Sequence, residues 1–316
     1  MPFDAAAMPD GFHLFAWDGF SLGIPDDWNL SHYRMDKRMC SVRMEDDTSV
    51  RLDLDYLRSI RPIDADAVLK RCARMTRDME QAGAHTTPLT DMPQGWTAWL
   101  HAMPDKRVLA TAFRPGQGLA AFLRLHFEDS SRRQCERLTR QVTAGFREQG
   151  GGVCLWSVYD GALEISSDYK LAETSFQAGR KCMVFHWRLR RLFFWFFSLA
   201  DMALRNTALE TWCADFLNKY KGLEGRRFEP IAPGRLRAVR LKRHPLGHMD
   251  EIGRLCFRYR IECRHVPAKN QILLALFHHR NDQDLNRLAL RLPDAGETPA
   301  APVESGSLLR PAQGGH

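Results

Sequence analysis

The stretch FAWDG at residues 15–19 returns as SVYDG at residues 157–161. Collinear matches follow at a spacing of about 141 residues. They join residues 27–30 to 168–171, residues 37–40 to 179–182, and Ala67, Cys72 and Ala73 to Ala208, Cys213 and Ala214. Short chance matches do not stay in order over about 60 residues, so the sequence predicts an internal duplication.

Each copy shows the same order of predicted elements: a hairpin, two strands, a helix, further strands and a closing helix. In the first copy, apolar and charged side chains alternate over residues 49–57, which predicts a half-buried strand. Helices are expected over residues 65–81, with Asp64 as N-cap, and over residues 130–149. The second copy is expected to have helices near 203–220 and 282–292. This order predicts an α+β fold, in which two tandem copies of an antiparallel sheet with helices form an intramolecular pseudo-dimer.

The expected boundaries follow from composition. We expect a flexible N-terminus over residues 1–10, a first α+β repeat over 11–150, a second and basic repeat over 151–292, and a disordered tail over 293–316. The three glycines at 150–152 mark the joint between the repeats. The tail is rich in Pro, Gly and Ala and has few large apolar side chains that could form a core.

Residues 17–28, WDGFSLGIPDDW, resemble the first hairpin of the Mog1/PsbP-like family. The resemblance extends over the first 150 residues by element order, and it is weaker in the second copy, where ISSDY at 165–169 lacks the proline. It implies a hairpin start, a central antiparallel sheet and flanking helices. It also implies a binding or assembly module rather than an enzyme. No catalytic residue carries over, because the family has no shared catalytic motif.

Positive charge is concentrated in the second half. The 316 residues hold 45 Lys and Arg against 38 Asp and Glu, a formal net charge of +7, of which the first 150 residues contribute −1. The densest basic residues are Arg235, Arg237, Arg240, Lys242, Arg243, Arg258, Arg260 and Arg264. On strands, Arg235 and Arg237 share one face, as do Arg258, Arg260 and Arg264, so we expect a basic sheet face that binds an anionic partner. Three interpretations stay open: a solvated face, a surface for an acidic protein, and a nucleic-acid surface.

One strand differs in character between the copies. Aligned on Cys40 and Cys182, the charged Arg51, Asp53 and Asp55 match the aromatic Phe193, Trp195 and Phe197. Three exposed rings of this size would form an apolar patch that marks an interface. The interpretations left open are packing against the other copy or a helix, a homodimer or partner surface, and a membrane surface or apolar ligand.

Patterns for catalysis and metal binding are weak. His244 and His248 have a metal-ligand spacing, but Pro245 and Gly247 disfavour the helix that it requires. The neighbouring Cys256, Cys263, His265, His278 and His279 fit no zinc pattern. Neither a Gly-x-Ser-x-Gly motif nor a phosphate loop is present, so we predict no catalytic residue, no metal and no cofactor. The eight cysteines contain no C-x-x-C pair and indicate buried thiols.

The expected location is the cytoplasm. Residues 1–4 show no leader pattern, and the most apolar run, 192–204, is too short to span a bilayer. The function expected is a non-catalytic binding or assembly module, whose second repeat presents a basic and aromatic surface to an acidic protein or other anionic partner, with a homodimer as a further option. One alternative is an enzyme or small-molecule binder that holds an anionic ligand in the groove between the repeats. The other is nucleic-acid binding.

Overall fold

The computed structural model describes residues 8–36, 39–59, 63–116, 118–128, 130–159, 161–221, 223, 226–240 and 258–292. The chain forms two compact units. Among the described residues, the first unit contains those within 8–149 and 157–159, and the second unit contains those within 150–156 and 161–292.

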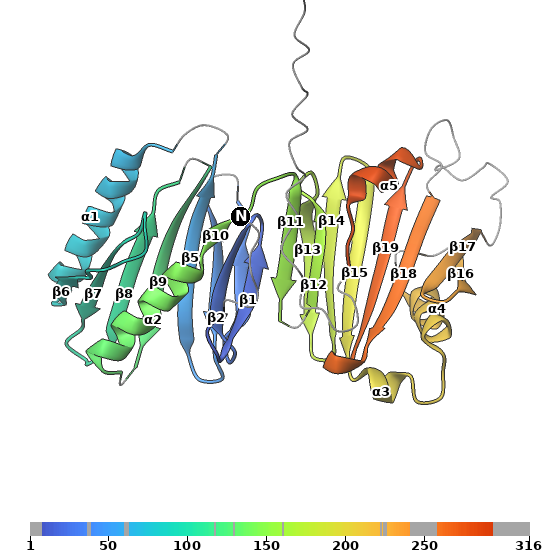
Figure 1. Cartoon of the computed structure of the whole chain (residues 1–316), viewed down its shortest axis with the longest axis horizontal. Coiled ribbons are helices and arrows are strands. Elements are labelled where there is room, and N and C mark those ends of the chain that lie inside the picture. The colour runs from blue at the N-terminus through green and yellow to red at the C-terminus, as the bar shows by residue number, and fades with distance from the viewer. Residues whose placement is uncertain are drawn as a thin grey trace, which may run out of the picture. The chain divides into compact units, whose positions relative to one another are not determined.

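A seven-stranded antiparallel sheet dominates the first unit, in the strand order β3-β4-β5-β9-β8-β7-β6 (Figure 1). Its strands are β3 (Asn29–Arg34), β4 (Cys40–Glu45), β5 (Val50–Arg58), β6 (His85–Pro88), β7 (Thr97–Ala102), β8 (Val108–Arg114) and β9 (Leu119–Phe127). The hairpin of β1 (Phe12–Trp17) and β2 (Phe20–Pro25) pairs through β2 with the short β10 (Arg147–Glu148).

The two helices of the first unit begin at side-chain caps. Helix α1 (Ala65–Gln81) begins where the Asp64 carboxylate accepts a hydrogen bond from the Asp66 N–H at 3.0 Å. Helix α2 (Arg132–Gly145) begins with a capping box between Ser131 and Gln134. Such caps satisfy N–H groups that the first helical turn leaves without partners, so the local sequence fixes where each helix starts.

The second unit has a sheet of the same topology, in the order β13-β14-β15-β19-β18-β17-β16 (Figure 1). Its strands are β13 (Lys170–Gln177), β14 (Arg180–Trp187), β15 (Arg190–Ser198), β16 (Arg226–Ala232), β17 (Arg235–Arg240), β18 (Arg258–Val266) and β19 (Gln271–His279). Strands β11 (Val153–Val158) and β12 (Gly161–Ser166) precede the sheet. The helices are α3 (Ala200–Ala203), α4 (Leu209–Lys219) and α5 (Gln283–Leu288), with a 3-10 turn at Pro267–Lys269.

Matching bulges interrupt the edge strands of the two sheets. The register shifts between Leu30 and His32 in β3, and between Leu171 and Glu173 in β13. Bulges at sheet edges bend the strand and hinder pairing with another chain. The sheets therefore share both a strand order and a local irregularity at the same edge.

The expected α+β class is wrong, because both units are β-rich. Strands hold 51% of the described residues and helices 21%. The helix predicted near 203–220 is shortened to α4, since the polar Asn206 and Thr207 form part of a turn between α3 and α4. The helix predicted near 282–292 has six residues in α5, whereas strands such as β15 and β19 have nine each. Each unit is therefore built mainly on an antiparallel sheet and is not the α+β copy that the element order suggested.

The cysteine match used to align the copies is out of register. Cys40 lies opposite Tyr56, whose hydroxyl reaches Asp18 in the β1–β2 turn at 3.2 Å. Cys40 therefore belongs to the sheet face that meets the β1–β2 hairpin, whereas Cys182 lies on the helix-covered face of its sheet, in the core under α4. Because successive strand residues point to opposite faces, equating the two cysteines shifts β4 against β14 by an odd number of residues. On the next strand, Asp53 of β5 and Trp195 of β15 both lie on the helix-facing side.

No helix in the described ranges is long and apolar enough to cross a membrane.

Candidate functional site

Helix α4 covers the aromatic strand that was predicted as an interface. Trp195 is 0% exposed, Phe197 is buried and Phe193 is partly buried in the same core. The rings that meet them come from α4 and its C-cap. The ring centre of Trp212 lies 4.8 Å from that of Phe197, and the ring centre of Tyr220 lies 5.1 Å from that of Trp195. The strand is thus packed against a helix of its own chain and leaves no exposed aromatic patch here.

A sequence signal for this cover exists but was missed. Trp212, Phe216 and Tyr220 recur at intervals of four residues, which places them on one face of a helix. An aromatic helix face and an aromatic strand in the same repeat predict each other as partners. Taken together, they indicate internal packing against a helix, which was one of the interpretations left open for this strand.

The first unit carries charge on the corresponding helix-facing side of β5. The Asp53 carboxylate is 2.8 Å from Nε of Arg43, 3.0 Å from Nε2 of His126 and 3.8 Å from Nη2 of Arg124. Burial alone would raise the pKa of Asp53, but the hydrogen bonds from His126 and Arg43 and the charge of Arg124 outweigh it and lower that pKa to about 2. This network stabilises the sheet in its ionised form.

We expect Asp53→Asn to lower the free energy of unfolding of the first unit by about 2 kcal/mol at pH 7, as the depressed pKa implies. Stability from a depressed carboxyl pKa is complete above the unfolded pKa and is lost as the pH falls through the folded value. The difference between wild type and variant, measured by urea unfolding, should therefore shrink between pH 4 and pH 2. Asp55→Asn, whose nearest cations lie 3.8 and 4.0 Å away, should cost less. A difference that does not change with pH would contradict the ionic role.

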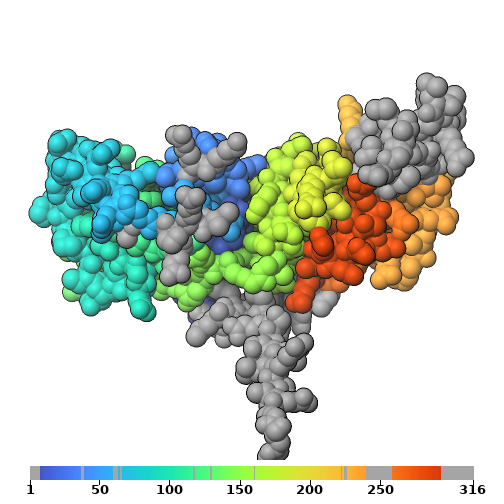
Figure 2. Space-filling view, turned by 90° about the horizontal axis from the view of Figure 1, so that it is seen from above, coloured from blue at the N-terminus to red at the C-terminus, as the bar shows by residue number. Residues whose placement is uncertain are grey.

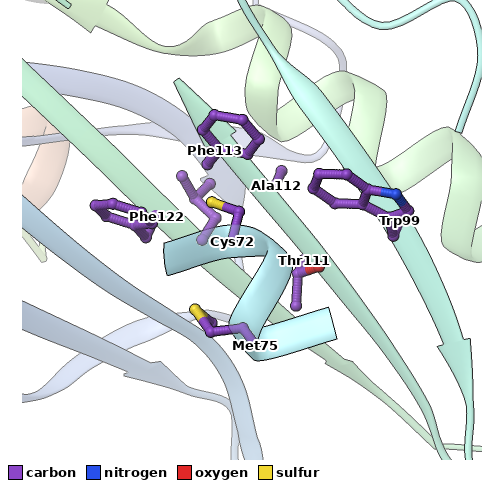
Figure 3. Close-up of a pocket in the computed structure, with 8 residues that line it drawn as sticks. Cys72, Met75, Trp99, Thr111, Ala112, Phe113 and Phe122 are labelled. Atoms are coloured by element: carbon purple, nitrogen blue, oxygen red, sulfur yellow. The ribbon is translucent and has the colours of Figure 1, made fainter. Parts of the chain in front are cut away.

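A small pocket lies between α1 and the first sheet (Figure 3). Cys72 and Met75 from α1 face the rings of Trp99, Phe113 and Phe122. Its space is about 240 Å³, part of it open solvent, which is below the roughly 300–1,000 Å³ of ordinary small-molecule sites. Burial raises the pKa of the Cys72 thiol to about 11, so little thiolate forms near neutral pH.

A buried histidine beside this pocket is fully used by the fold. His101 is 0% exposed and hydrogen-bonds to the hydroxyls of Thr86 at 3.0 Å and Thr111 at 2.8 Å. Burial lowers its pKa, so the ring stays neutral and can donate through one nitrogen while accepting through the other. The arrangement joins β6, β7 and β8 and leaves no ring nitrogen for catalysis.

The arginines predicted in the second half gather on strands β16, β17 and β18. These strands contain eight arginines and two glutamates, a net charge of +6. The cross-strand register places most of these arginines on the sheet face opposite α4. We call this set the arginine face: Arg227, Arg235, Arg237, Arg258, Arg260 and Arg264, with Glu229 and Glu262 among them. In Figure 2, residues of this part of the chain appear in orange at the surface of the second unit.

The ion pairs on this face are exposed. Arg237 lies 3.0 Å from Glu229, Arg258 lies 2.9 Å from Asp282, and Arg260 pairs with Glu262. The side chains of Arg237 and Arg258 are 62% and 63% exposed. Pairs of this kind contribute about 0–1 kcal/mol, so the guanidinium groups can exchange their partners for other anions at little cost.

The other predicted basic residues make different contacts from these exposed pairs or fall outside the described residues. Arg264 donates from Nη1 to the Leu292 carbonyl at 3.0 Å and so also holds the segment after α5. Arg240 ends β17, where its backbone lies opposite that of Arg226. Lys242 and Arg243 lie outside the described residues. Arg227 and the interleaved Glu229 were not predicted, because the sequence of their strand, RRFEPIA, does not alternate regularly between polar and apolar residues.

The described histidines and cysteines near this face belong to the packing. Cys263 is buried under α4, His278 stacks on Tyr259 at 4.9 Å, and His279 stacks on Phe277 at 5.2 Å. His265 is partly buried on the same side as Cys263. Across the part of the chain that the structure describes, no group of three or more His, Cys, Asp or Glu is placed to hold a metal ion. His244, His248 and Cys256 fall outside that part.

No family model matches the chain, and a search of curated proteins finds no match. The resemblance of residues 17–28 to the Mog1/PsbP-like family therefore stays a prediction.

Proposed function

We propose that the chain is a non-catalytic binding module that holds an acidic protein partner on the arginine face. The observation that carries the proposal is the net charge of +6 on three adjacent strands, displayed on the side of the sheet that α4 does not cover. Such a field attracts an anionic surface and chiefly raises the association rate.

The composition of the face favours a protein over a nucleic acid. The aromatic residues of these strands, Phe228 and Tyr259, point toward α4, so the face offers no ring on which a base could stack. Exposed Ile231 and Val239, on β16 and β17, offer the apolar contact that protein partners use.

Charge reversal tests the proposal. We expect Arg235→Glu with Arg237→Glu to weaken binding of poly-L-glutamate at least tenfold, because two attractive charges become repulsive. Arg133→Glu with Arg137→Glu on α2 of the first unit removes the same net charge and should change binding less than twofold. Isothermal titration at about 50 mM salt gives both affinities, and raising the salt should weaken wild-type binding.

Three results would overturn the proposal: equal losses in the two double variants, no binding of poly-L-glutamate at low salt, and tighter binding of a single-stranded oligonucleotide than of poly-L-glutamate. The last result would favour nucleic-acid recognition instead.

A further inference from the structure

We infer that Trp187 and the arginines around it form a binding site for a phosphate group, separate from the arginine face. Trp187 ends β14, Arg188 lies in the following turn, Arg190 begins β15, and Arg287 comes from α5. Their guanidinium carbons lie 5.4, 4.7 and 5.6 Å from the centre of the indole ring. Three cations from three elements thus meet on one aromatic side chain.

The indole of Trp187 packs against a buried aromatic side chain, so the site is already formed before a ligand binds. Tyr169 is 2% exposed, and its ring lies 5.9 Å from Trp187 and 6.0 Å from Phe277. Trp187 is also paired across the hairpin with Arg190. A fixed ring restricts the arginines stacked on it, which lowers the entropy lost when they bind.

One of the three arginines is neutralised. Arg190 donates to the Asp284 carboxylate at 2.7 Å, with side chains 13% and 4% exposed. Asp284 also accepts hydrogen bonds from the N–H groups of Arg280 at 3.0 Å and Asn281 at 3.2 Å. This buried pair anchors α5 to the start of β15 and so positions Arg287 beside the indole.

The other two cations remain available. Arg188 and Arg287 are exposed, and neither has a carboxylate partner among the residues that the structure describes. A guanidinium group stacked on an aromatic ring keeps its N–H groups at its edge, where they can donate to an anion. The site therefore presents two unneutralised guanidinium groups at a fixed platform.

Charge selects the class of ligand. A phosphate monoester carries about −1.5 to −2 at neutral pH and has three acceptor oxygens, which matches two guanidinium groups. A single carboxylate would leave one of the two positive charges without a partner. We therefore assign the site to a phosphate group, carried either by a small metabolite or by a phosphorylated side chain.

Calorimetric titration with pyrophosphate tests the site in the full chain. We expect Arg188→Gln and Arg287→Gln each to weaken binding about tenfold, as loss of a charged hydrogen bond predicts. Trp187→Leu should weaken binding similarly, whereas Trp187→Phe keeps a ring for stacking and should retain most of the affinity. Arg205→Gln, an exposed arginine in the turn after α3, is the matched control and should bind as wild type does. Circular dichroism checks that each variant folds.

Further ligands identify the source of the phosphate group. Acetate should bind more weakly than pyrophosphate. Comparison of a sugar phosphate with a phosphoserine peptide shows which of the two sources the site prefers, and tight binding of either supports the site. The inference is overturned if no phosphate compound binds, if acetate binds as well as pyrophosphate, or if Arg205→Gln reduces affinity as much as the site variants do. Because none of these residues lies on the arginine face, failure here leaves the proposed function untouched, and the reverse also holds.

Discussion

Trp195→Ala is expected to lower the free energy of unfolding of the second unit by about 3–5 kcal/mol, the usual cost of truncating a buried large aromatic residue. Trp195 is 0% exposed. Its ring centre lies 5.5 Å from that of Phe193, 5.6 Å from that of Phe216 and 5.1 Å from that of Tyr220. Its loss leaves a cavity beneath α4 that the surrounding rings cannot fill without leaving their own contacts. Hydrogen exchange read by mass spectrometry should show faster exchange in peptides from α4 and β15.

Trp99→Ala in the first unit is the comparison. Trp99 is only partly buried beneath α1, so its truncation removes less apolar area from the core and should cost less. If Trp195→Ala costs no more than Trp99→Ala, the aromatic strand is not the core of the second unit.

Asp284→Ala is expected to cost about 3–5 kcal/mol, because it leaves the Arg190 guanidinium buried without its anion. The substitution also removes the acceptor for two backbone N–H groups before α5. We expect α5 to exchange faster, and binding of pyrophosphate at Trp187 to weaken with it.

A double variant separates charge from packing. Asp284→Ala with Arg190→Met removes both charges and should be more stable than Asp284→Ala alone, because no uncompensated charge remains. Equal stability of the single and double variants by urea unfolding would contradict the buried pair.

The sequence predicted local features of the fold better than its class. Helix α1 begins at the predicted Asp64 cap and spans the predicted residues 65–81, because the cap and the helical period lie within one short segment. The class was wrong because the long pairings of β15 with β19 and of β5 with β9 join residues far apart in the chain. Local sequence propensity does not reveal how much of the chain such strand pairings occupy.

The candidate sites show the same contrast: the sequence predicted the site that depends on local alternation and missed the site that depends on distant residues. Alternation along β18 predicted that Arg258 and Arg260 share a face, and the cross-strand register places them there. The ring of arginines at Trp187 was missed, because Arg287 reaches it from a helix about 100 residues further along the chain. For the aromatic strand, packing against a helix was one of the interpretations left open, and α4 is the helix that covers it.

Arginine-selective labelling by phenylglyoxal, followed by mass spectrometry, tests the central claim most directly. With poly-L-glutamate bound, we predict protection of Arg235, Arg237, Arg258 and Arg260, and unchanged labelling of Arg133 and Arg137 on α2. Protection spread evenly over all exposed arginines, or confined to α2, would contradict the assignment of the partner surface to strands β16 to β18.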